Sequence, residues 1–74
     1  NGFGTLTVTA GKRKITVESS LRHATDVRIV NLAGITLSTF TIEPGETVET
    51  RINTSGVYMV ESPDNMYTKK ITVR

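Results

Sequence analysis

The chain lacks cysteine and tryptophan, and its only imidazole is His23. Without cysteine it can form neither a disulfide nor a thiolate metal site. A catalytic Ser–His or Cys–His arrangement is disfavoured, because a single histidine without cysteine offers few ways to build one. A chain of 74 residues buries little surface when it folds, so its stability must come from the packing of apolar side chains alone.

Long hydrophobic runs and a strong charge of one sign are also missing. No apolar segment is long enough to span a membrane, and there is no signal-peptide hydrophobic region. The formal charge is +2, from nine Lys and Arg against seven Asp and Glu, which is too small to indicate nucleic-acid binding. The length of 74 residues predicts a single domain over residues 1–74. The start at Asn1, with no initiating Met, indicates that this domain is a fragment of a longer protein.

Alternation of apolar and polar residues predicts strands along almost the whole chain, and no segment has helical periodicity. The predicted strands cover residues 5–10, 14–18, 26–32, 35–42, 47–52, 57–60 and 67–74. The side chains predicted to point inward include Leu6, Val8, Ala10, Ile15, Val17, Val27, Ile29, Ile71 and Val73. About seven short, mainly antiparallel strands separated by turn residues are typical of an all-β, immunoglobulin-like β-sandwich.

Three features of this pattern have structural consequences. Residues 54–60 run from a small-residue turn into a segment that is apolar on both faces, as suits a central strand. Residues 19–25 lack strand periodicity and are predicted to cross between the sheets. Within residues 35–42 the inward set changes parity between Leu37 and Phe40, which predicts a β-bulge near Ser38 and Thr39.

Residues that could support catalysis are few. His23, with Asp26 and Ser20 nearby in sequence, is the nearest approach to a catalytic cluster, but it lies in the predicted loop without a second anchor. We therefore interpret His23 as a surface residue. Three glutamates recur at every third position, at Glu43, Glu46 and Glu49. This spacing does not bring carboxylates together in a strand and turn, so the sequence predicts no enzyme.

Candidate ligand sites have simpler structural explanations. Asp64–Asn65 could bind calcium, but this cation needs six or more oxygen ligands, and turn propensity explains the pair better. The glycines of residues 2–4 lack the strand and helix that frame a phosphate loop. Tyr58, Tyr67 and Phe40 could form a carbohydrate or peptide platform, but core and cross-strand packing is the favoured interpretation. We expect no cofactor and no metal.

Three segments occur together in an order that is distinctive. The pattern V-x-I-x-[DN]-L-x-G is present at residues 27–34, turn-G-[VI]-Y-x-V at residues 55–60, and a Lys-rich last strand at residues 69–74. In these segments the chain resembles the C-terminal sorting domains of cargo proteins of the type IX (Por) secretion system of Bacteroidetes. Residues 1–25 depart from the family because they contain no proline, whereas such domains often begin with a Pro-Asn-Pro segment. The motif positions are Val27, Ile29, Asn31, Leu32, Gly34, Gly56, Tyr58 and Val60.

This resemblance implies a seven-stranded β-sandwich at the C-terminus of an exported protein. Such a cargo crosses the inner membrane by its own signal peptide, and the outer-membrane translocon then recognises its C-terminal domain. In most members a sortase-like protease removes the domain and attaches the cargo to the cell surface. The resemblance therefore implies a non-catalytic export signal, with the translocon and the sortase as partners. Its expected locations are the periplasm in transit and then the outer membrane, the cell surface or the medium.

The last strand contains the candidate contact residues for a partner. Lys69, Lys70 and Arg74 flank Ile71 and Val73, and an exposed strand edge can add to a partner's sheet. Equally, the lysines could protect the edge from unwanted pairing. An exposed edge would also allow two copies to form a homodimer. The alternative function is an immunoglobulin-like accessory or glycan-binding module of a bacterial surface protein, which predicts exposed aromatic residues on one face.

Overall fold

The computed structural model describes residues 4–65 and 67–74. The predicted strands are all present, and their bounds differ only slightly from the predicted ranges. A short 3-10 turn, η1 (Pro63–Asn65), follows the sixth strand where Pro and Asn predicted a turn. The strands are β1 (Leu6–Gly11), β2 (Lys14–Ser19), β3 (Thr25–Asn31), β4 (Thr36–Ile42), β5 (Thr47–Arg51), β6 (Gly56–Ser62) and β7 (Tyr67–Val73).

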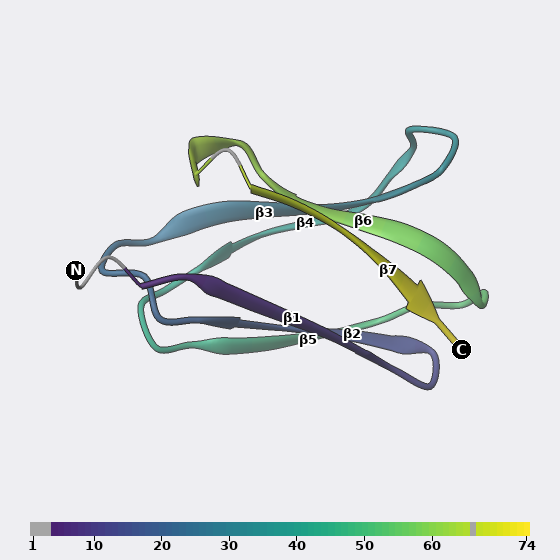
Figure 1. The fold of residues 1–74 in the computed structure, drawn as a ribbon, viewed down its shortest axis with the longest axis horizontal. Coiled ribbons are helices and arrows are strands. Elements are labelled where there is room, and N and C mark those ends of the chain that lie inside the picture. Colours follow the sequence, from purple (N-terminus) through teal and green to yellow (C-terminus); the bar gives the residue numbers. More distant parts are fainter. Residues whose placement is uncertain (1–3, 66) are drawn as a thin grey trace.

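The strands form two antiparallel sheets that pack face to face as a β-sandwich (Figure 1). One sheet has the order β1-β2-β5 and the other the order β4-β3-β6-β7. The predicted all-β sandwich is therefore confirmed. In a constant-type immunoglobulin domain the fourth strand joins the sheet of the first, second and fifth strands. Here β4 pairs with β3 and lies in the other sheet.

Apolar side chains from the inner faces of both sheets form one core. Its fully buried members include Ile15 and Val17 of β2, which face Val27 and Ile29 of β3 from the opposite sheet. Of the residues predicted to point inward, Ala10 and Leu37 are exposed. Ala10 lies opposite the buried Ile15, but it is near the end of the edge strand β1 and lines an open hollow there.

The segment 54–60 provides the interior strand that its sequence predicts. β6 pairs with β3 on one side and β7 on the other. Tyr58 and Val60 point into the core, and Val57 and Met59 are half-buried on the outer face. The Tyr58 hydroxyl donates a hydrogen bond to the Thr54 carbonyl four residues upstream, as in the tyrosine corner of immunoglobulin-like domains.

The bulge predicted in β4 is present, but it lies slightly nearer the hairpin. Ile29 is opposite Ser38 and Val30 is opposite Thr36, so Leu37 is an extra residue on β4. Ser38 and Phe40 then follow the inward alternation. The prediction that Leu37 points inward is therefore wrong, since 46% of its surface is exposed.

Candidate functional site

The last strand is an edge strand. β7 pairs only with β6, so its other side presents unpaired backbone groups. Lys69, Lys70 and Arg74 are all exposed. The Arg74 carbonyl accepts a hydrogen bond from the Arg13 amide at 2.8 Å, which ties the end of the chain to the β1–β2 turn. Three of the five candidate contact residues are thus available to a partner.

The other two candidates lie in the core. Ile71 is 9% exposed and Val73 is 1% exposed, because both point toward the opposite sheet. A partner at this edge would therefore reach their backbone and not their side chains. Lys69 has the same parity as Ile71 but remains exposed. An inward-pointing lysine of this kind is a common means of preventing edge-to-edge pairing.

Most of the family-motif positions have a structural role. Val27, Ile29 and Val60 are fully buried in the core. Gly34 and Gly56 have positive φ angles of 84° and 149°, which residues with a side chain rarely adopt. Leu32 is the exception, because it is 67% exposed and contributes nothing to the core.

Asn31 organises the turn between β3 and β4. Its side-chain oxygen accepts hydrogen bonds from the backbone N–H groups of Ala33 (2.9 Å) and Ile35 (3.0 Å). The Asn31 carbonyl accepts from Gly34 N–H, and its own N–H donates to the Ile35 carbonyl, both at 3.0 Å. Side-chain bonding of this type is why Asn favours turns. The hairpin tip therefore has a defined conformation.

This turn presents an apolar tip, which sequence reasoning missed. Leu32, Ile35 and Leu37 are 67%, 59% and 46% exposed, and they are the exposed large hydrophobic residues of the chain as described. We call these three residues the apolar tip. Grouped exposed apolar residues indicate an interaction surface more strongly than single ones. The available signal was the turn sequence Leu-Ala-Gly-Ile, since turns are normally polar.

A hollow of about 460 Å³ adjoins the apolar tip. It lies between Leu37 on β4 and the chain that leaves β5, and Tyr58 and Ile52 give it apolar walls. Arg51 is the charged residue of its lining. The complete lining is Asn31, Leu37, Arg51, Ile52, Asn53, Thr54 and Tyr58.

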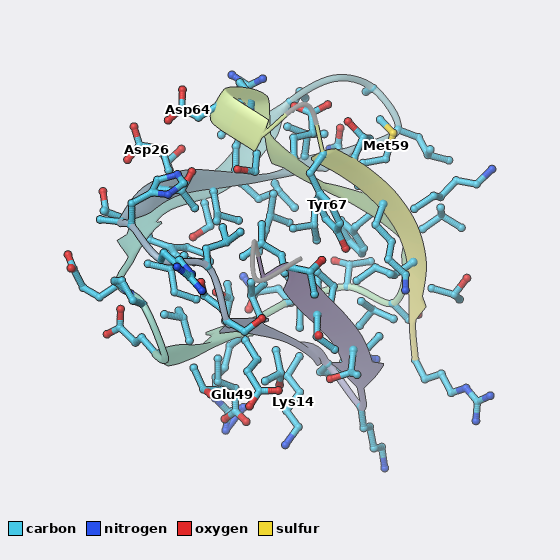
Figure 2. All side chains as sticks on the ribbon, turned by 60° about the vertical axis from the view of Figure 1, so that its left-hand side comes forward. Lys14, Asp26, Glu49, Met59, Asp64 and Tyr67 are labelled. Carbon is cyan, nitrogen blue, oxygen red and sulfur yellow. The ribbon has the colours of Figure 1, made fainter. Side chains whose placement is uncertain are left out.

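Charge is distributed unevenly along the sandwich. The β1–β2 turn, with Lys12 and Arg13, lies at the same end of the molecule as the β3–β4 turn and the C-terminal end of β7 (Figure 1). Lys14, the next cation, pairs with Glu49 at 3.2 Å (Figure 2). Glu43 and Glu46 lie in the β4–β5 turn at the opposite end.

The predicted alternatives for catalysis are not brought together. The Ser20 hydroxyl bonds to the backbone of Thr5, and the Asp26 carboxylate accepts from the Thr41 hydroxyl at 2.8 Å. His23 is exposed in the β2–β3 connection, as interpreted from the sequence.

The three glutamates also serve local structure. A Glu46 side-chain oxygen accepts from the Glu43 N–H at 2.9 Å within their turn. Glu49 forms its ion pair on β5. The carboxylates therefore do not converge on one point, as their spacing predicted.

The aromatic residues considered for glycan binding belong to the core. Tyr58 is buried, and Phe40 is half-buried and packs against the core. Tyr67 is also half-buried and packs against the core (Figure 2). Partial burial raises the pKa of the Tyr67 phenol above its ordinary value. Packing, the favoured interpretation, is confirmed, and none of the three forms an exposed platform.

The described residues offer neither a metal site nor a membrane-spanning helix, and the chain matches no known family. Among residues 4–65 and 67–74, no group of three or more His, Cys, Asp or Glu side chains could hold a metal ion, and no helix is long and apolar enough to cross a membrane. Residues 2 and 3 of the glycine-containing segment 2–4 lie outside the described residues. No family model matches the chain, and no match is found among curated proteins or solved structures.

Proposed function

We propose that this chain is a non-catalytic sorting domain of the type IX kind. In this proposal it is the C-terminal part of an exported protein and is recognised by the outer-membrane translocon, with a sortase-like protein as a second partner. The observation that carries the proposal is the position of the last strand, an edge strand with exposed Lys69, Lys70 and Arg74. Such an edge can be recognised by strand addition combined with charge.

The arrangement of the three motifs supports the proposal. They lie apart in the sequence, yet they form β3 with its turn, β6 and β7, which are consecutive neighbours in one sheet. The first two motifs supply core residues, the Asn31 turn and the tyrosine hydrogen bond. Their role is to build the sheet that holds β7 in place. This leaves β7 as the motif strand whose polar side chains and outer edge face solvent.

A charge-reversal experiment tests this proposal better than a deletion. Deleting residues 68–74 would remove Ile71 and Val73 from the core and would unfold the domain. The double variant Lys69→Glu and Lys70→Glu changes only exposed side chains. We fuse the chain behind a periplasm-targeted reporter in a Bacteroidetes host that has the secretion system, and we measure the reporter on the cell surface and in the medium.

We expect the double variant to lose most of the secreted reporter while the purified domain keeps its β-sheet circular dichroism. The control is Arg22→Glu, which reverses an exposed cation in the β2–β3 connection and should leave secretion unchanged. Full secretion of the β7 variant would contradict the role of this strand. Retention of the unmodified fusion in the periplasm would contradict the sorting function itself.

A further inference from the structure

The sheet that ends in β7 has a second edge, at β4. β4 pairs only with β3, so its other side presents unpaired backbone groups. Its seven residues, Thr36–Ile42, include no charged side chain. Charged side chains, proline and β-bulges are the usual means of protecting an edge. β4 has no charged residue and no proline, and its bulge is confined to Leu37, so residues 38–42 keep a regular register with β3. This edge is therefore open to a partner strand.

The open edge leads to the hollow beside the apolar tip. β4 and β5 are joined by a short turn at one end of the sandwich and diverge toward the other end (Figure 1). The hollow lies between them, where Leu37 faces the segment 51–54. Ile52 and Tyr58 are core residues that also line it, so an apolar side chain placed there would extend the core.

The charges around the hollow favour an anionic group. Arg51 is directly opposite Lys14 in the β2–β5 register, and like charges at such positions destabilise a sheet. Lys14 has Glu49 as its partner, whereas Arg51 forms no ion pair with any residue that the structure describes. No carboxylate lines the hollow. A carboxylate from a ligand would relieve this repulsion.

We propose that an extended segment of a partner protein adds along the β4 edge and places an apolar side chain beside Leu37 and Tyr58 and an Asp or Glu carboxylate against Arg51. Backbone hydrogen bonds provide affinity in this mode of recognition, and pockets for side chains provide specificity. The Asn31 turn fixes the apolar tip in advance, which lowers the entropy cost of binding.

A partner segment fits this surface better than a second copy of the chain. Pairing of two β4 strands would offer no carboxylate from within the strand, because Thr36–Ile42 contains no Asp or Glu, and the nearest one, Glu43, lies in the β4–β5 turn. The inference does not depend on the proposed sorting function, since that function concerns β7 at the other edge of the sheet.

Selection from a phage-displayed library of random dodecapeptides tests the inference. The intact domain should enrich peptides in which an apolar residue is adjacent to Asp or Glu or is separated from it by one residue. The amide NMR shifts that change when such a peptide binds should lie in β4 and residues 51–54. In fluorescence anisotropy, Arg51→Glu and Leu37→Ser should each weaken binding about tenfold or more, as expected when a charge-assisted or apolar anchor contact is lost.

Matched controls separate this site from other surfaces. Arg22→Glu reverses an exposed cation outside the hollow and should leave the affinity unchanged, as should the Lys69→Glu and Lys70→Glu pair on β7. Each variant is checked by circular dichroism. Enriched peptides without a carboxylate, equal binding to Arg51→Glu, or shifts along β7 would overturn the inference. Self-association of the domain through β4 that blocks peptide binding would also overturn it.

Discussion

The two outer strands of the four-stranded sheet, β7 and β4, differ in almost every respect that matters for recognition. β7 fills the core with Ile71 and Val73 and presents Lys69 and Lys70 to solvent. β4 has no charged residue, and its bulge leaves Leu37 exposed beside a hollow. Both strands place side chains in the core, since β4 contributes the fully buried Ile42, but one edge is charged whereas the other is uncharged and exposes Leu37.

This difference shows that an exposed edge can have two opposite meanings. Lysines on β7 discourage pairing with most strands, so a partner must offer complementary acidic groups to bind there. β4 lacks this protection, and it therefore admits a strand by its backbone alone and depends on the hollow for specificity. The strand with the most charge is thus not the strand that is easiest to extend.

The largest expected difference between the edges is in stability. Ile71→Ala removes apolar volume from the core and should lower the free energy of unfolding by about 2 kcal/mol or more. Leu37→Ala removes an exposed side chain and should change it by about 0.5 kcal/mol or less. Urea denaturation followed by circular dichroism measures both. Equal losses for the two variants would show that Leu37 contributes as much to the stability of the fold as Ile71.

A second expected effect concerns the turn that holds β4. Asn31→Ala removes the oxygen that accepts from two backbone N–H groups, and it should cost about 1–2 kcal/mol. Amide hydrogen exchange should become faster at Ala33 and Ile35, and exchange at β7 should follow only the change in global stability. The conservative variant Asn31→Asp keeps an acceptor and should preserve most of the protection. Unchanged exchange at the turn in Asn31→Ala would contradict the role of this side chain.

The alternation of apolar and polar residues was sufficient to predict the sandwich, because buried and exposed residues follow a period of two in most strands. It predicted the inward direction of Val27, Ile29, Ile71 and Val73 correctly. It did not predict the exposure of Ala10 and Leu37, because Ala10 is near the end of an edge strand and Leu37 is the extra residue of a bulge. Neither position is fixed by the residues beside it in sequence.

The candidate site was less predictable than the fold. The exposure of Lys69 and Lys70 follows from their charge, but the burial of Ile71 and Val73 separates residues that the sequence grouped as one contact strand. The hollow depends on the divergence of β4 from β5, which places Leu37 across from residues 51–54 far along the chain. Pairing between distant strands decides such a feature, and local pattern carries no information about it.

Substitutions at the edges test the protective role of charge with little change in stability. Lys69→Thr with Lys70→Thr keeps residues that suit a strand and should alter the free energy of unfolding by about 0.5 kcal/mol or less. Sedimentation velocity should nevertheless show self-association at a lower protein concentration than for the intact domain. Thr39→Lys adds the missing charge to β4 and should reduce association through that edge. If the double variant stays monomeric over the same range, the lysines do not protect β7.

The smallest expected effect uses pH, since β7 contains ionisable side chains and β4 contains none. Burial raises the pKa of Tyr67 in the folded state above the unfolded value of about 10. The contribution of the Tyr67 phenol to the stability of the fold is therefore complete below about pH 10, and it is lost as the pH rises through the folded pKa. The difference in free energy of unfolding between the intact domain and Tyr67→Phe should be constant near neutral pH. In alkali the intact domain should lose stability relative to Tyr67→Phe. The free energy of unfolding of Leu37→Ala should change with pH in the same way as that of the intact domain. Parallel curves of unfolding free energy against pH for Tyr67→Phe and the intact domain would show that the phenol is as well solvated in the fold as in the unfolded chain. In that case only the aliphatic residues of β7 would be anchored in the core.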